Sequence, residues 1–373
     1  PGTESVRGPI RDLTGVEIFT NLVSITCSSE QLSWLPDLST LTELGILYAH
    51  DNYLVTLPNL DSLAELSSLN INWNNISRLP SLSALGSLRY FYAGDNNFSE
   101  FPDVSGLVDL RILDVSYNQL TDIPGIGALT TLQHVTLTEN AFSELPDLSA
   151  SAGLMSLYVT GNLLTSLPDL SIFPDLKTLH VGRNQLSEIP GLASLSNLDN
   201  FRCNYNLLTD ISDIAGLTKL YNFACSYNSI TALPDMSALT EMEYLYTSEN
   251  PITSIPGLSS MTKLRTLYVD GTAITDFSAI AGLTSLEKLY MFNTSVGVMP
   301  DLSALDNLNT LYCEGCGLVD IPDVTGCDAI DRFRCYWNLF GPDDCPTIQA
   351  IEAMGLSYFD YNPQDVGGDL ICE

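Results

Sequence analysis

Apolar residues recur along this chain in a pattern that repeats every 22 residues, and the register holds from Leu22 to Ile330 in fifteen copies. The second full copy shows the regular form, with apolar residues at Leu44, Leu47, Ala49, Leu54, Leu57, Leu60 and Leu63. A fixed period of this length is typical of a solenoid, in which each copy buries its apolar face only against its neighbours. The pattern therefore predicts one elongated domain of stacked copies.

Each copy also contains a short alternating segment and a turn. The alternation predicts a strand of about three to five residues, and consecutive copies run in the same direction, so the strands should form one long parallel sheet on a concave side. Proline fixes φ and lacks an N–H donor, so it predicts extended or 3₁₀ segments on the convex side. It lies on the same 22-residue grid at Pro36, Pro58, Pro80, Pro102, Pro124, Pro146, Pro168, Pro190, Pro234, Pro256, Pro300 and Pro322, with Ser212 and Ser278 at the two remaining grid positions. The expected fold class is an α/β-type solenoid arc.

Asparagine occupies one template position in ten consecutive copies and completes the pattern L-x-x-L-x-L-x-x-N-x-L, which is that of leucine-rich repeats. The ten are Asn52, Asn74, Asn96, Asn118, Asn140, Asn162, Asn184, Asn206, Asn228 and Asn250. An inward asparagine has two donors and an acceptor, which satisfy backbone groups where the chain leaves the strand. We expect a buried ladder with a structural role and no ligand.

The pattern divides the chain into three parts: a tail and cap at 1–21, the repeats at 22–340, and a cap at 341–373. Terminal repeats of a solenoid must depart from the template, because each end would otherwise expose an apolar face. At the N-terminal end we expect closure by Ile10, Leu13, Val16 and Phe19.

The C-terminal cap has a different pattern. Thr347 to Met354 predicts a short amphipathic helix with Ile348, Ile351 and Met354 on one face. Leu356 to Tyr361 predicts a last strand.

The chain is strongly acidic, with a formal net charge of −31. This charge argues against nucleic acid or an anionic membrane surface as a partner. No apolar run is long enough to insert in a membrane, and no signal-peptide pattern is present. With only 16% charged residues, the surface must consist mostly of Ser, Thr, Asn, Tyr and Asp, and we expect a secreted or cell-surface protein.

Part of the acidity forms a column directly after the grid position. Its members are Asp37, Asp103, Asp147, Asp169, Asp213, Asp235, Asp301 and Asp323. Aspartate starts turns well because its carboxylate accepts hydrogen bonds from nearby backbone N–H groups. A calcium-binding edge is the alternative, but neighbouring copies lack the several close oxygens that calcium needs. We therefore predict turn caps and no metal.

The nine cysteines do not form a simple disulfide framework. Seven of them fall on inward template positions and should be buried thiols: Cys27, Cys203, Cys225, Cys313, Cys316, Cys327 and Cys335. Bridges between Cys203 and Cys225, or between Cys313 and Cys335, are possible by spacing but awkward for parallel side chains. Cys345 and Cys372 lie outside the repeats and are our candidate disulfide.

Tyrosine is concentrated at one outward strand position. The column contains Tyr48, Tyr92, Tyr158, Tyr246, Tyr268, Tyr290 and Tyr312, and beside it lie Tyr244, Phe292 and Tyr336. Four consecutive members should stack about 4.8 Å apart as an exposed ribbon. Cross-strand stacking that stabilises the sheet is one interpretation. A partner-binding platform is the other, because Tyr is enriched at binding hot spots, and the bias toward one column favours it.

Nothing in the sequence indicates catalysis or a cofactor. The three histidines, His50, His134 and His180, are expected to point outward from non-adjacent strands, without a catalytic partner or metal-ligand spacing. We therefore predict a non-enzyme.

Two segments resemble bacterial internalin-type leucine-rich repeats: the entry from Leu13 to Ser29 and the stretch from Leu208 to Thr218. The inward cysteines are similar to those of the cysteine-bearing internalin subgroup. The resemblance implies a secreted or surface protein that binds host proteins or adheres to cells, although the regular Leu-Pro-Asp turns differ from it. An extracellular protein is the expected partner of the tyrosine column. A carbohydrate ligand, or self-assembly of a surface component, stays open.

Overall fold

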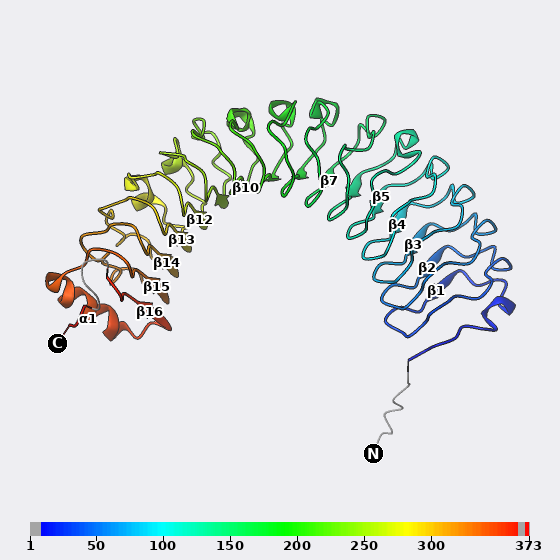
Figure 1. Ribbon diagram of the computed structural model, residues 1–373, viewed down its shortest axis with the longest axis horizontal. Coiled ribbons are helices and arrows are strands. Elements are labelled where there is room, and N and C mark those ends of the chain that lie inside the picture. Colours follow the sequence, from blue (N-terminus) through cyan, green and yellow to red (C-terminus); the bar gives the residue numbers. More distant parts are fainter. Residues whose placement is uncertain (1–8, 365–369, 373) are drawn as a thin grey trace, which may run out of the picture. The chain divides into compact units, whose positions relative to one another are not determined.

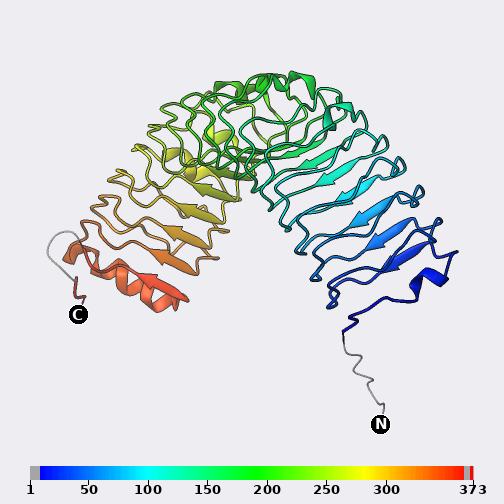
Figure 2. The ribbon, with the colours of Figure 1, turned by 45° about the vertical axis from the view of Figure 1, so that its right-hand side comes forward.

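The computed structural model describes residues 9–364 and 370–372 (Figure 1). The chain divides into two compact units, Pro1–Asn184 and Gln185–Glu373. Both are solenoids of short parallel strands in chain order, so the predicted fold class is confirmed in each unit. Within each unit the strands lie along one side and the turns and 3₁₀ helices lie along the opposite side (Figures 1 and 2).

In the described residues, each unit has eight three-residue strands. The first unit has β1 (Ser24–Thr26), β2 (Ile46–Tyr48), β3 (Ser68–Asn70), β4 (Tyr90–Tyr92), β5 (Ile112–Asp114), β6 (His134–Thr136), β7 (Ser156–Tyr158) and β8 (Thr178–His180). The second has β9 (Asn200–Arg202), β10 (Asn222–Ala224), β11 (Tyr244–Tyr246), β12 (Thr266–Tyr268), β13 (Lys288–Tyr290), β14 (Thr310–Tyr312), β15 (Arg332–Arg334) and β16 (Tyr358–Asp360). Equivalent residues pair across neighbouring strands, as Ile46 pairs with Ser68. The middle residue of all but the last strand is buried, so the 22-residue period becomes an apolar column inside and polar columns outside.

The turn side is irregular, and eight of its segments within residues 9–364 and 370–372 are 3₁₀ helices. They are η1 (Val16–Ile18), η2 (Ile126–Ala128), η3 (Leu170–Ile172), η4 (Leu192–Ser194), η5 (Ser212–Gly216), η6 (Leu258–Ser260), η7 (Ser278–Gly282) and η8 (Pro342–Asp344). Several follow a Pro-Gly pair, because the glycine takes the left-handed conformation that starts the turn; Gly257 has φ 84°. A Cβ at Gly257 would lie 2.2 Å from the Ser237 nitrogen. Most Leu-Pro-Asp copies instead stay in extended and turn conformations.

The asparagine ladder is hydrogen-bonded as predicted, and its members are buried except for Asn118, Asn140 and Asn228, which are half-buried. Asn162 Oδ1 accepts the N–H of Phe142, 3.1 Å away, in the preceding repeat. Its Nδ2 donates to the carbonyl oxygens of Leu137, also in the preceding repeat, at 3.0 Å and of Val159 at 3.1 Å. Each asparagine therefore joins two repeats and closes its own turn.

The aspartate column caps the turns. Asp103 Oδ1 accepts the backbone N–H of Ser105 at 2.8 Å, and these hydrogen bonds lower the pKa of the Asp103 carboxyl. The same bond recurs at Asp37, Asp147, Asp169, Asp235, Asp301 and Asp323. Asp213 lies inside η5, and the bond to the backbone N–H of Ser212 is made by Asp210 instead.

The ends of the chain differ in part from expectation. Helix α1 spans Cys345–Met354, two residues longer than predicted, and buries Ile348 and Ile351 while Met354 is exposed. The last strand is shorter than predicted. At the other end, Ile10 and Phe19 are exposed and Leu13 and Val16 are half-buried. The expected apolar closure by these four residues is therefore wrong, since two of them are exposed and the other two are only half-buried.

The cysteines separate into two classes. The seven cysteines on inward template positions are buried thiols, and burial raises the pKa of Cys225 and its neighbour Cys203 far above the usual range. Cys345 and Cys372 are joined by a disulfide that connects α1 to the C-terminal segment, with Cα atoms 5.2 Å apart.

We predict that Asn162→Ala lowers the free energy of unfolding by about 3 kcal/mol, because it leaves buried backbone groups of two repeats unpaired. Urea unfolding followed by circular dichroism measures the change. The exposed Asn75→Ala is the control and should shift the midpoint little. A loss below about 0.5 kcal/mol at Asn162, the level of an ordinary surface substitution, would contradict a structural ladder.

Candidate binding surface

The candidate surface is the outward face of the strands in the second unit. In each strand the first and third side chains point away from the core, and the residue two positions after the strand returns to the same face. The third position holds Tyr246, Tyr268, Tyr290 and Tyr312 on the consecutive strands β11 to β14. We call these four residues the tyrosine ribbon.

The four rings of the ribbon contact one another. The centroids of Tyr246 and Tyr268 are 5.0 Å apart with planes at 36°, and those of Tyr268 and Tyr290 are 4.0 Å apart with planes at 14°. Tyr290 meets Tyr312 edge to face at 5.0 Å and 77°. The spacing is close to the expected strand separation, but only the central pair is stacked. All four are half-buried, so the ribbon is less exposed than expected, because each ring covers part of the next.

An arginine ends the ribbon on β15. The guanidinium carbon of Arg334 lies 4.9 Å from the ring centroid of Tyr312 and 5.3 Å from that of Tyr336. Arg334 Nη2 also donates to the Tyr336 hydroxyl oxygen at 2.8 Å, and Nη1 lies 3.6 Å from Oε1 of the buried Glu314. The cation is thus held against aromatic faces by cation–π attraction.

Two buried carboxyl groups lie beside the ribbon in the column of Phe292 and Tyr336. Burial raises the pKa of Asp270, although its Oδ1 accepts a 2.6 Å hydrogen bond from Ser248 Oγ. Burial likewise raises the pKa of Glu314 and outweighs the attraction of Arg334. Burial and a side-chain hydrogen bond with Tyr290 raise the pKa of Tyr268 above its usual range. The two carboxyl groups beside the ribbon are therefore poorly hydrated.

The remaining candidate residues are distributed over both units. Tyr244 and Phe292 are half-buried on the ribbon face of the second unit. Tyr48, Tyr92 and Tyr158 are half-buried on the first unit, where non-aromatic residues of the same column separate them. Their rings do not form a ribbon.

The histidines point outward as expected and are half-buried. The ring of His180 meets Tyr158 edge to face at 4.8 Å, and His50 Nδ1 lies 2.8 Å from Ser28 Oγ. Within residues 9–364 and 370–372, no cluster of three or more His, Cys, Asp or Glu side chains could hold a metal ion.

Residues just after the strands form a second aromatic column that the sequence did not mark as a site. Its backbone is left-handed, with φ between 51° and 58° at the aromatic members, and their side chains are 44–56% exposed. These members are Trp73, Tyr117, Tyr205, Tyr227 and Trp337. Tyr205 and Tyr227 stack at 4.3 Å and 8°. The sequence feature that could have identified this column is a bulky aromatic residue at a template position whose backbone conformation favours Gly or Asn.

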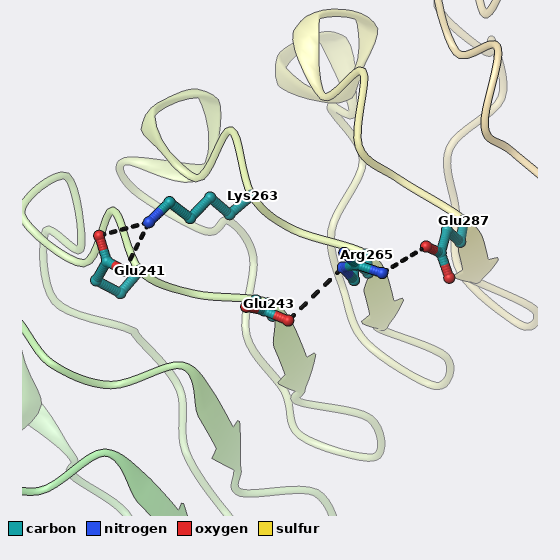
Figure 3. Close-up of polar contacts among 5 residues, drawn as sticks. All are labelled: Glu241, Glu243, Lys263, Arg265 and Glu287. Atoms are coloured by element: carbon teal, nitrogen blue, oxygen red, sulfur yellow. Dashed lines mark hydrogen bonds and ion pairs between the residues drawn. The ribbon is translucent and has the colours of Figure 1, made fainter.

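Charged residues line the edge where the strands begin. Lys263 Nζ contacts both carboxylate oxygens of Glu241 at 2.7 and 2.6 Å (Figure 3). Arg265 lies between Glu243 at 3.6 Å and Glu287 at 3.0 Å (Figure 3). These pairs are about half exposed, so each contributes little to stability. Each of these two cations therefore has a carboxylate partner.

Comparison with known proteins identifies the architecture. No protein-family model matches the chain, and no curated protein sequence matches it. Among solved structures, the functional domain of InlJ from Listeria monocytogenes matches at 27% identity and a TM-score of 0.79, over 86% of this chain and 69% of that one. This chain is a leucine-rich-repeat protein.

Two further structures share the fold of this leucine-rich-repeat protein. The internalin InlF of Listeria monocytogenes matches at 23% identity, over 79% of this chain and 87% of that one, with a TM-score of 0.71. The Arabidopsis receptor kinase HAESA, solved with the peptide hormone IDA and the co-receptor SERK1, matches at 22% identity, over 94% and 67%, with a TM-score of 0.75.

The cysteines support the internalin resemblance. The InlJ domain includes a cysteine ladder. Here Cys203 and Cys225, and likewise Cys313 and Cys335, occupy the same buried position one repeat apart. The likeness to internalin-type repeats that the sequence indicated is therefore confirmed. Across the described ranges, no helix is both long and apolar enough to span a bilayer.

We predict that Asp270→Asn stabilises the protein at pH 7. The folded chain holds the Asp270 proton to a higher pH than the unfolded chain, because burial raises its pKa above 3.8. The free energy of unfolding therefore falls as the pH rises from the pKa of the unfolded chain to the higher pKa of the folded chain. At pH 7 the buried, ionised carboxylate destabilises the folded chain, and the neutral amide of Asn avoids this cost. Thermal unfolding at pH 7 and at pH 3 measures the effect, which should shrink at pH 3.

Asp301→Asn is the matched control in the same unit. Its carboxyl accepts the N–H of Ser303, which lowers its pKa, so its stabilisation is present above the ordinary pKa and is lost as the pH falls. This variant should gain no stability at pH 7. Equal shifts of the unfolding temperature in the two variants at both pH values would contradict a raised pKa of Asp270.

Proposed function

We propose that this chain is a non-enzymatic binding module that recognises a protein partner through the tyrosine ribbon. The single observation that carries the proposal is the contact of four half-buried tyrosine rings on consecutive strands. Tyrosine supplies a large rigid surface together with a hydroxyl at low entropic cost. Because neighbouring rings already restrict each other, little side-chain freedom remains to be lost on binding.

Three features support recognition over catalysis. The outward face carries aromatic and amide side chains, and the two carboxyl groups on it whose pKa is raised, Asp270 and Glu314, are buried rather than accessible. The ribbon lies beside an edge of paired charges, which resembles the polar rim of a protein interface. The related fold of HAESA was solved with a bound peptide hormone.

A secreted or cell-surface location accompanies this function. The disulfide between Cys345 and Cys372 is of a kind that persists in oxidising compartments. The net charge of −31 disfavours nucleic acid and anionic lipid. The cysteine-ladder likeness to InlJ at 27% identity supports the same location.

A carbohydrate ligand is the second candidate. The observation that favours it is the exposed pair Tyr205 and Tyr227 beside Asn204 and Ser226 on the same face, because aromatic and amide groups also suit sugars. Self-assembly of a surface component is a third outcome of the tests below.

We predict that Tyr268→Ala with Tyr290→Ala reduces partner affinity by roughly 30-fold or more, the effect of losing hot-spot contacts. Arrays of extracellular proteins and of glycans identify the partner, and surface plasmon resonance measures the affinity. Tyr53→Ala removes a tyrosine that is 58% exposed and lies outside the column, and it should leave the affinity unchanged.

The outcomes separate the candidates. An unchanged affinity in the double variant would remove the ribbon as the site. A large fall in the unfolding temperature without a change in affinity would assign the rings to sheet stability. Inhibition by free oligosaccharide would favour the carbohydrate ligand, and silence on both arrays would favour self-assembly.

A further inference from the structure

The tyrosine ribbon stops at a gap. Strand β11 carries Tyr246 at the third position, the next strand β10 carries Ala224, and β9 carries Arg202. A methyl group thus lies between two large side chains of the same column. The result is a hollow of about 340 Å³, which is within the range of ligand-binding pockets.

The gap has the dimensions of one aromatic ring. Parallel strands lie about 4.8 Å apart, so the backbones that carry Arg202 and Tyr246 are about 10 Å apart, which is two ring-to-ring steps. Tyr246 contacts Tyr268 on one side at 5.0 Å. On its other side the neighbouring residue is Ala224, which carries no ring. The column therefore lacks one rung between a guanidinium and a tyrosine.

The other end of the same column shows the completed arrangement. There Arg334 lies over the ring of Tyr312 at 4.9 Å, with no gap between cation and aromatic. Arg202 is exposed, and it makes no ion pair in the described ranges. Its positive charge complements the negative face of an aromatic ring. A ring inserted above Ala224 would contact Arg202 as Tyr312 contacts Arg334.

The rim of the hollow is aromatic. Tyr205 and Tyr227 form it, with φ of 55° and 58° and side chains 51% and 44% exposed. A left-handed backbone is unfavourable for a bulky residue, and the high exposure gives no core burial in return. Other repeats are also left-handed at this position, as at Asp95, Glu139 and Glu249, so the distinguishing feature of this rim is its pair of exposed aromatic rings.

We propose that this hollow receives an aromatic side chain of the protein partner, which stacks between Arg202 and Tyr246 above Ala224. The inference rests on the proposed function and adds the chemistry of one contact. An aromatic residue in a pocket that excludes water is the typical anchor of a protein interface. A flat aromatic ring matches the width of the gap, and its negative π face would lie toward the positive charge of Arg202.

The test fills the hollow with a side chain of the protein itself. Ala224→Tyr places in the hollow the residue that the next four strands carry in the same register, so it should fold normally and complete the column. Ala224→Ser keeps the hollow open and is the matched control. The probe is N-acetyl-L-tyrosinamide, titrated by ligand-observed NMR, with N-acetyl-L-leucinamide and methyl β-D-glucopyranoside as comparison ligands.

We expect the tyrosine probe to bind the unmodified chain and Ala224→Ser with a Kd on the order of 1 mM. Ala224→Tyr should weaken binding roughly tenfold or more, and Arg202→Gln should weaken it several-fold while leaving the hollow open. Should Ala224→Tyr fail to fold, as judged by circular dichroism, Arg202→Gln alone decides the outcome. The Tyr268→Ala/Tyr290→Ala variant should still bind the probe, so the two proposals fail separately.

Three results would overturn the inference. Absence of saturable binding to the unmodified chain would show that the hollow takes no aromatic ring. Equal binding to folded Ala224→Tyr, or no effect of Arg202→Gln, would place the probe elsewhere. Tighter binding of the leucine or sugar probe would assign the hollow to an aliphatic group or a carbohydrate.

Discussion

The hydrogen-bonded asparagine ladder is the interaction on which the rest of each unit depends. A three-residue strand must be followed at once by a bend, and that bend lies in the interior, where water cannot satisfy its backbone groups. Asn52 shows the solution: its Oδ1 accepts the N–H of Leu32, and its Nδ2 donates to the carbonyl oxygens of Cys27 and Ala49. Because each bond set reaches the preceding repeat, the bends are held in a common register.

That register turns a one-dimensional repeat into columns of side chains. Equivalent residues of neighbouring strands face each other, so any residue type that recurs at one outward position becomes a continuous strip. The ribbon from Tyr246 to Tyr312 arises in this way. The same geometry makes a single small residue conspicuous, since Ala224 interrupts a column whose neighbours are large.

The carboxyl groups on the turn side and on the strand side have pKa values shifted in opposite directions. On the turn side, aspartates accept backbone hydrogen bonds and their pKa values are lowered. On the strand side of the second unit, the raised pKa values of Asp270 and Glu314 reflect carboxyl groups removed from water beside the tyrosine ribbon. Low hydration near the ribbon strengthens its polar contacts, such as those of Arg334.

The sequence alone determined the period, the strand register, the asparagine ladder, the inward cysteines and the tyrosine column, because each follows from which template position a residue occupies. It failed at the chain ends, where no template applies: Ile10, Phe19 and Met354 are apolar but exposed. Only the tertiary structure decided that the ribbon is half-buried and stacked only at its centre, that Arg334 covers one end, and that Tyr205 and Tyr227 border a hollow. These features depend on side-chain rotamers and on contacts between residues 22 or more positions apart, which a repeat pattern does not specify.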